Sequence, residues 1–477
     1  MKIRVHLVMC DDDGHKETAT EVVILEKACQ RIEQVGLTLA EAKALLTGLQ
    51  QRIVERQIAT FLATHRHCQV CGQALRTKGH HALTFRTLFG TITLNSLRLH
   101  QCACTPDETA TFSPLTQLLS EHTAPELLLM ETKWASLVSY GLTAQALKDF
   151  LPVDETLSVS TVRANALAVA QRCEAELGDE QMSFIDGCPR DWEQLPMPDS
   201  PITVGIDGGY VRDWDEKKRQ FEVIVGKSIL AFRRDEEEDI PSSKCFGFVQ
   251  TLDTKPKRRL FEVLQSQGLQ LNQQLTFLSD GGDTVRDLQR YMSPEAEHLL
   301  DWFHVSMRLT VLQQTAKGLP DKTREEEDYP LRDPVGQELE RLKWFLWHGN
   351  VYKALQVVQS VEMNLDAAVA TSRDHTARKL LKAVEEFHTY IENNQGFIPN
   401  YGERYRNGER ISTGFVESTV NQVISKRFCK KQQMQWTKRA AHLLLQIRVK
   451  TLNHELATVF RRWYPDFPLQ QSEAQAA

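Results

Sequence analysis

The chain has 477 residues, enough for two to four domains, with 41% hydrophobic residues, 25% charged residues and a formal net charge of −6. No apolar run is long enough to cross a bilayer, and the first residues lack the apolar segment of a secretory signal, so we expect a cytoplasmic protein. Charge is unevenly distributed, however. Residues 401–450 hold eleven Lys and Arg against three Glu, or +8 (11 − 3), so this block could hold a phosphate backbone.

Residues 1–64 are expected to form an N-terminal domain without recognisable chemistry. Two strand-like runs, Ile3–Met9 and Thr18–Leu25, come first. A helix is predicted to begin at Thr38, because Thr38 and Glu41 have the spacing of a capping box.

Residues 65–112 contain two close cysteine pairs, at the positions Cys68, Cys71, Cys102 and Cys104. Between them, Phe89–Leu99 is interpreted as a strand pair around Gly90. Four thiolates complete a tetrahedral structural zinc site, so a zinc-ribbon-like domain is predicted. Two alternatives stay open: a nearby histidine (His65, His67 or His100) could replace one cysteine, or the pairs could be ordinary thiols. The other cysteines are scattered, which argues against a disulfide framework.

Residues 113–182 have the pattern of a helix-turn-helix domain. Helices are predicted over 125–138, 143–150 and about 158–177, with Pro152 ending the second. The third helix begins with small polar residues and an arginine, which suit contacts with DNA bases or phosphates. Its candidate DNA-binding residues are Ser160, Thr161, Arg163 and Asn165. The alternative is a plain helical hairpin that packs against other domains. A proline-rich linker, 183–201, follows.

Two aspartates follow apolar strands and precede glycines. The strand 201–211 alternates, with Ile202, Val204 and Ile206 on one face and Asp207 on the other. The strand Leu275–Ser279 ends in Asp280 and two glycines. Glycines beside an acid leave room for a bulky group, such as a sugar-phosphate backbone, to approach the carboxylate.

The order of elements from residue 200 onward predicts an RNase H-like α/β sheet. Three strands (201–211, 221–231 and 244–252) precede a helix (258–265), a fourth strand, a helix (284–291) and a short strand at His298–Leu300. In that fold the first and fourth strands are parallel neighbours, so Asp207 and Asp280 are expected close together. Carboxylates that close repel unless a cation neutralises them, and their hard oxygens select Mg²⁺ or Mn²⁺.

A third acid is expected from a later helix, and the candidate is Glu417. Glu417, Val420, Asn421 and Ile424 are predicted to share one helical face. Basic residues surround this segment and could bind phosphate, at the positions Arg410, Lys426, Arg427, Lys430 and Lys431.

At this point the sequence resembles bacterial insertion-sequence transposases of the DDE class, and most closely the Kra-type insertion-sequence family. The resemblance lies in Gly205–Gly209, Leu278–Gly282, Asp301–His304 and Gly414–Thr419. The wider group includes mutator-type and hAT-type elements, which have a Cys/Asp-x-x-His motif, here Asp301 and His304. These elements insert a helical domain before the catalytic Glu. The resemblance therefore implies an RNase H-like core in two parts, 200–304 and 401–465, interrupted by a helical insertion over 305–400.

The resemblance implies a DNA transposase that binds element ends and target DNA, cleaves strands and transfers them. Asp207, Asp280 and Glu417 would hold two Mg²⁺ (or Mn²⁺) ions. His304 would help position the scissile phosphate, and Asp301 would be a structural partner of the site or a helix cap. By analogy, at least a homodimer is expected on DNA, at the bacterial nucleoid.

Three further alternatives remain open. Trp344 and Trp347 either stack on a flipped base or belong to the core. The enzyme is either a transposase or an RNase H-like nuclease that hydrolyses without joining. From another class, the chain could be a catalytically silent DNA-binding protein derived from a transposase.

Overall fold

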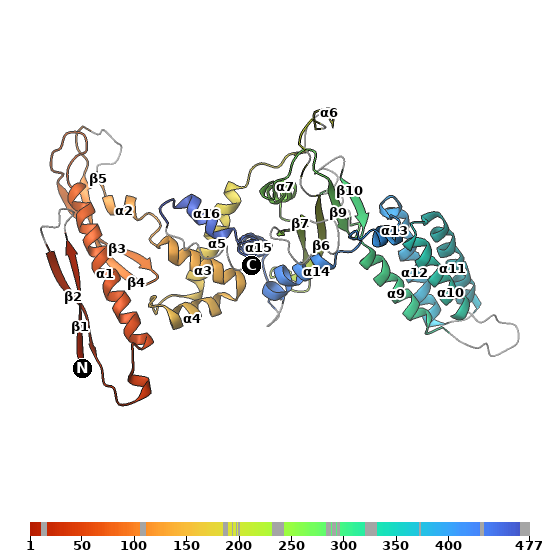
Figure 1. Ribbon diagram of the computed structural model, residues 1–477, viewed down its shortest axis with the longest axis horizontal. Helices are drawn as coiled ribbons and strands as arrows, with labels where there is room; N and C mark the ends of the chain where they lie inside the picture. Colours follow the sequence, from red (N-terminus) through yellow and green to blue (C-terminus); the bar gives the residue numbers. More distant parts are fainter. Residues whose placement is uncertain are drawn as a thin grey trace. The chain divides into compact units, whose positions relative to one another are not determined.

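A computed structural model describes residues 1–10, 17–104, 111–184, 189–192, 194–196, 198, 201–230, 243–282, 288, 292, 296–319, 332–371, 374–429 and 434–467 (Figure 1). The chain is a mixed α/β protein of more than one domain. Its contacts divide it into two units: residues 1–171 together with the described residues from His454 on, and residues 172–453. Each unit is described by itself below.

The first unit begins with a β-hairpin and a long helix. Strands β1 (Lys2–Cys10) and β2 (Glu17–Glu26) pair antiparallel, and α1 (Leu39–Thr64) contacts β2 (Figure 1). A short 3-10 turn, η1 (Ile32–Gln34), lies between them. The predicted capping box is confirmed, because Thr38 and Glu41 each accept a hydrogen bond from the other's backbone N–H.

A three-stranded antiparallel sheet follows, in the order β3 (Thr77–Thr87), β4 (Gly90–His100) and β5 (Thr111–Phe112). The predicted strand pair around Gly90 is present, but its bounds are wrong, because it spans Thr77–His100 and not Phe89–Leu99. Those residues form a single strand, because the turn precedes Gly90, whose positive φ of 128° begins β4. The partner strand is the more polar stretch upstream of it.

Helices complete the first unit. The predicted helices 125–138, 143–150 and 158–177 correspond to α3 (Pro125–Leu137), α4 (Tyr140–Phe150) and α5 (Val159–Glu176). Short α2 (Pro114–Leu118) precedes them. The C-terminal helix α16 (Leu456–Trp463) packs against α3, so residues 454–465, predicted with the catalytic core, group instead with the first unit.

The second unit is built on a five-stranded sheet in the order β10-β9-β6-β7-β8. Strands β6 (Ile202–Arg212), β7 (Gln220–Ile229) and β8 (Lys244–Val249) pair antiparallel. Strands β9 (Leu275–Ser279) and β10 (Glu297–Leu300) join parallel to β6. The first and fourth strands of this unit are therefore parallel neighbours, as predicted.

Helices cover both faces of this sheet. Helix α7 (Pro256–Ser266) buries Leu260 and Leu264 against a core that includes Ile202, Val204 and Ile206. The opposite face is covered by α14 (Gly414–Val420), the π-helix η4 (Asn421–Cys429) and α15 (Lys438–Leu452). The helix predicted over 284–291 lies almost entirely outside the described residues. Short α6 (Pro189–Trp192) lies in the predicted linker.

The predicted helical insertion is present as a bundle with its own core. Its helices are α9 (Trp302–Ala316), α10 (Arg332–Trp347), α11 (Val351–Thr371) and α12 (His375–Asn394) (Figure 1). Leucines and valines at helical spacing are fully buried between them, for example Leu339, Val358 and Leu380. The turn η3 (Gln395–Phe397) and α13 (Tyr401–Arg406) lead back toward the sheet. No helix among the described residues is long and apolar enough to span a membrane.

Candidate active site and metal centre

Three aspartates stand in one row across three parallel strands, with Asp207 inside β6 and with Asp280 and Asp301 directly after β9 and β10. β6 pairs with β9 up to Gly205 and Leu278, so two further residues place Asp207 opposite Asp280. β9 pairs with β10 up to Ser279 and Leu300, so one further residue places Asp280 opposite Asp301. Neighbouring strands lie about 4.8 Å apart. The sheet itself therefore brings these three acids together, although nearly one hundred residues separate the first from the last.

The two glycines that flank Asp207 on its face of β6 receive the helix that bears Glu417. A Cβ atom on Gly205 would lie 2.1 Å from Val416 Cγ2, and one on Gly209 would lie 2.7 Å from Ile424 Cδ1. The prediction that these glycines admit a sugar-phosphate backbone is therefore wrong for this face, because protein side chains already occupy the space. Their role is to let α14 and η4 sit directly on the strand beside Asp207.

Asp301 is fully buried and its carboxylate is committed to protein groups. It caps α9 by accepting from the Phe303 N–H at 2.9 Å, and it accepts from His304 Nδ1 at 2.7 Å. It also accepts from the Thr413 N–H at 3.0 Å and from the Thr413 hydroxyl. Thr413 immediately precedes α14. Asp301 thus ties together the beginnings of the His304 helix and the Glu417 helix, which fits the structural role considered for it rather than a catalytic one.

The loop that follows Asp280 is held in place by the C-terminal end of α12, the last helix of the bundle. Tyr390 on α12 donates its hydroxyl proton to the Asp280 carbonyl, at 3.0 Å. Asn394, buried at the end of α12, packs so closely on Gly281 that a Cβ there would lie 2.2 Å from its Oδ1. Gly281 also has a φ of +84°, which favours glycine. The first and last helices of the bundle therefore both contact the end of the sheet where the acids lie.

The electrostatics of this group are those of carboxylates in excess. Burial raises the pKa of Asp207, and the charges of Asp280 and Asp301 raise it further, against the Gly208 N–H and His304. Partial burial and the Asp207 charge raise the pKa of Glu417. The hydrogen bond to Asp301 raises the pKa of His304, which burial opposes. These acids and His304 lie close enough for their charges to influence one another. When the carboxylates are all ionised, the protein supplies too few cations to balance their negative charge.

A fourth carboxylate, Glu222, lies near enough for the charges of Asp280 and Asp207 to act on it, and it was missed by the sequence analysis. It lies on β7 opposite Tyr210, and its Oε1 stands 2.7 Å from the position of a Cβ on Gly208. Burial raises its pKa, and the charges of Asp280 and Asp207 raise it further. Nothing in its sequence surroundings marks it, since a single glutamate in a strand is ordinarily a solvated edge residue.

The carboxylates do not converge on one point. Among the described residues, the ligand atoms of Asp207, Asp280 and Glu417 do not all lie within 4.8 Å of one another. Asp207 Oδ1 accepts from the Gly208 N–H at 2.7 Å and Asp280 Oδ1 from the Gly282 N–H at 3.0 Å. Glu417 is exposed, whereas Val420 and Ile424 pack on Gly209 of β6, so the residues predicted to share one helical face differ in their environment. The helix changes to π geometry from Asn421, which alters that spacing.

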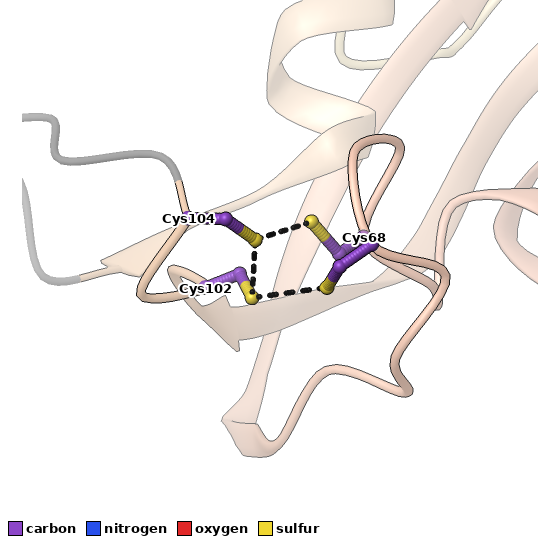
Figure 2. Close-up of side chains that lie close together, drawn as sticks. Cys68, Cys102 and Cys104 are labelled. Atoms are coloured by element: carbon purple, nitrogen blue, oxygen red, sulfur yellow. Dashed lines mark hydrogen bonds between the residues drawn. The ribbon is translucent and has the colours of Figure 1, made fainter.

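Four cysteines in the first unit do converge. The sulfur atoms of Cys68, Cys71, Cys102 and Cys104 all lie within 4.8 Å of one another. Figure 2 shows Cys68, Cys102 and Cys104 pointing toward one another. Neighbouring sulfurs are 3.1–3.6 Å apart, too far for a disulfide. Sulfurs around a tetrahedral zinc ion would be about 3.8 Å apart, given a Zn–S bond of about 2.3 Å. These four cysteines could therefore hold a metal such as zinc, and no histidine is needed to complete the set.

Local backbone geometry prepares the cysteines for a cation. The first pair lies in a turn after α1, where Gly72 takes a φ of +72° and donates to the Cys68 carbonyl at 2.9 Å. The backbone N–H groups of Cys71 and Val70 lower the pKa of Cys68 to about 6. The Cys104 backbone N–H lowers the pKa of Cys102, whereas the thiols around Cys104 raise the pKa of that residue. The lowered pKa values of Cys68 and Cys102 favour the thiolate form that binds a divalent cation.

The predicted DNA-contacting residues of α5 differ in their exposure. Ser160 and Arg163 are exposed. Thr161 is half-buried, and the cap residue Ser158 accepts from its backbone N–H at 3.1 Å. The Asn165 side chain is engaged within the first unit, because its amide donates a hydrogen bond to buried Glu131 at 2.6 Å. The prediction that Asn165 reaches a base is therefore corrected: its amide satisfies a buried carboxyl.

The basic C-terminal block presents less charge to solvent than its sequence predicts. Lys426 is exposed, but Arg427 is 2% exposed with its guanidinium 5.0 Å from the Trp436 ring centre. Arg427 is therefore a packing residue, which corrects its assignment to DNA. Arg410 and Arg448 are buried too, and burial lowers the pKa of Arg448 to about 10. Lys430 and Lys431 lie outside the described residues.

The two tryptophans of α10 have different environments. Trp347 packs on Trp302 and Tyr401, with ring centres 4.9 and 6.5 Å away, and it lies over Gly402. Trp344 is 50% exposed and stacks on His348. Trp347 thus belongs to the core, and only Trp344 presents a ring to solvent.

Comparison with known proteins assigns no family to the chain: no protein-family model matches it, and no curated protein matches it either. The site is therefore interpreted from its own residues.

Proposed function

We propose that this chain is a DNA transposase of the DDE class, which cleaves DNA at the ends of its element and joins them to a target. The observation that supports this most strongly is the alignment of Asp207 and Asp280 on adjacent parallel strands, with the Glu417 helix seated beside Asp207 on two glycines. The strand order β10-β9-β6-β7-β8 is the one expected of an RNase H-like core.

The donor set suits hard divalent cations. Carboxylate oxygens favour Mg²⁺ or Mn²⁺. Burial and, to a smaller extent, the charges of Asp280 and Asp301 raise the pKa of Asp207, and a cation would offset both. The three acids do not form one close group of ligand atoms, which is compatible with two ions, because ions about 4 Å apart place ligands of different ions up to about 8 Å apart. When bound, such ions supply an activated water or 3′-hydroxyl and stabilise the leaving oxygen.

The chain's own residues would share the remaining work. Asp207, Asp280 and Glu417 would hold the cations, with Glu222 as an additional carboxylate near the first two. His304, oriented by Asp301 at Nδ1, keeps Nε2 for the scissile phosphate, and its raised pKa favours the protonated form beside an anion. Asp301 and Tyr390 act as positioning residues, since each fixes a loop or helix that bears an acid.

The first unit would recognise DNA. Its four-cysteine site would hold structural Zn²⁺, and the exposed Ser160 and Arg163 at the beginning of α5 are available to DNA. Transposases act on paired ends, so we expect at least a dimer on the DNA.

The test is incubation of the purified chain, with Mg²⁺, and a labelled duplex that carries the two ends of its own element. Nicked ends together with products joined to a target plasmid, absent for Asp280→Ala, would support a transposase. Cleavage without joined products would favour the nuclease alternative. Binding without cleavage in either Mg²⁺ or Mn²⁺ would favour a catalytically silent DNA-binding protein and would leave the acids without this role.

A further inference from the structure

Arg308 stands at the rim of the carboxylate group, on the helix that begins at Asp301. It lies four residues after His304 on α9, one helical turn or about 5.4 Å further along. Its side chain is exposed. Its guanidinium lies 4.2 Å above the centre of the Tyr390 ring, whose hydroxyl donates to the Asp280 carbonyl. Arg308 is thus attached, through one aromatic ring, to the loop of the second catalytic acid.

Arg308 differs from other arginines of this unit, because its partner is an aromatic ring and not a carboxylate. Arg259 and Arg404, also in the second unit, each bind two carboxylates. Within the part of the chain that is described, no ion pair joins Arg308 to any acid, although Asp280 and Asp301 lie close enough to influence Tyr390. An aromatic ring orients a guanidinium without neutralising it, so its N–H donors stay available to a ligand.

A phosphodiester is the ligand that this position requires. The charges of Asp207, Asp280, Glu222 and Glu417 act on one another and would oppose the approach of a substrate phosphate. A fixed cation at the rim offsets that repulsion. The planar guanidinium can also donate two parallel hydrogen bonds to one phosphate, which a lysine cannot do.

We propose that Arg308, held in place by the Tyr390 ring, binds a phosphate of the DNA strand next to the one that is cut. This inference rests on the proposed function, because it takes DNA as the substrate of the carboxylate site. Arg308 would be a substrate-binding residue, and Tyr390 would position both it and the Asp280 loop.

The test measures DNA binding by fluorescence anisotropy, with the labelled duplex from one element end and Ca²⁺ in place of Mg²⁺, over a series of salt concentrations. Arg308→Gln is expected to weaken binding about tenfold and to reduce the salt slope by about 0.9, the value for one lost phosphate contact. Arg308→Lys is expected to keep the salt slope but lose part of the affinity, because the charge stays and the paired hydrogen bonds do not.

The matched control is Arg341→Gln on α10. Arg341 is also exposed and lies 5.9 Å from the Phe345 ring centre, but it pairs with Glu338. Arg341→Gln should leave the DNA affinity and the salt slope unchanged. All variants should have the melting temperature of the parent chain. Cleavage by the parent chain together with unaltered binding by Arg308→Gln would overturn this inference alone. A parent chain that binds no DNA would overturn both this inference and the proposed function.

Discussion

The two candidate metal sites of this chain are built in opposite ways. The cysteine site is local: two short turns, about thirty residues apart, bring four sulfurs within 4.8 Å of one another. The carboxylate site is assembled over long distances from β6, β7, the end of β9 and α14, and its acids do not converge to that degree.

This difference indicates different tasks. A closed set of four thiolates leaves no position for a substrate, as in structural zinc sites. An open set of carboxylates leaves positions for substrate oxygens, and burial together with like charges raises the pKa of Asp207. We therefore expect the first site to support folding and the second to support chemistry.

The largest effect should come from the aspartates of the open site. Asp207→Asn and Asp280→Asn are each expected to reduce cleavage of labelled element ends more than about a thousandfold, because each removes a charged cation ligand worth several kcal/mol to the transition state. Asp215→Asn, an exposed aspartate in the turn between β6 and β7, should cleave like the parent chain. Comparable loss in that control would indicate a general charge effect instead.

The closed site should respond in stability rather than in chemistry. Cys68→Ser is expected to abolish stoichiometric zinc binding and to lower the melting temperature by about 10 °C or more, since a structural site contributes several kcal/mol to folding. Zinc content per chain and thermal melting provide the measurements. Cys29→Ser, an exposed cysteine of the same unit, should change neither. A Cys68→Ser chain that melts like the parent would mean that the four cysteines do not support the fold.

The contact between α14 and β6 can be tested at a single glycine. Gly205→Ala places a Cβ 2.1 Å from Val416, so overpacking should destabilise the fold by about 1–3 kcal/mol and displace the Glu417 helix. Cleavage is expected to fall together with the melting temperature. Gly336→Ala on α10 meets no atom within 4 Å and should be neutral or slightly stabilising, by up to about 1 kcal/mol. Equal effects of Gly205→Ala and Gly336→Ala would contradict the close contact between α14 and β6.

The smallest effect concerns Asp207 and pH. Its folded pKa is raised above 3.8, so the folded chain holds this proton more tightly than the unfolded chain does. Stability is therefore lost as the pH rises from 3.8 through the folded pKa. At pH 7 without divalent cations, Asp207→Asn should melt slightly higher than the parent, and Mn²⁺ should stabilise the parent but not the variant. Equal stabilisation of both by Mn²⁺ would place the cation elsewhere.

The strands and the two aspartates could be predicted from the sequence, because each is marked locally. Alternation in β6 and the apolar run of β9 identify strands, and their parallel pairing follows from the order of elements. The four-cysteine cluster was also predictable, since paired spacing alone indicates it.

Other parts of the site depend on contacts that no local pattern records. Tyr390 reaches the Asp280 carbonyl from 110 residues away, and Glu222 joins the acids only because β7 pairs with β6. The glycines of β6 predict open space beside the strand. The segment that fills this space, however, is a helix more than 200 residues downstream. Arg427 was misjudged for the same reason, because its charge is visible in the sequence and its burial against Trp436 is not.

The two-ended attachment of the helical bundle has a consequence for any attempt to shorten this chain. Asp301 and His304 begin its first helix, and Tyr390 and Asn394 end its last, and all four contact the carboxylate-bearing end of the sheet or the segments around it. Excising residues 305–400 and closing the gap with a linker would remove the supports of the Asp280 loop along with the bundle. The bundle is thus a brace for the Asp280 loop, and a shortened chain must retain it to keep that loop in place.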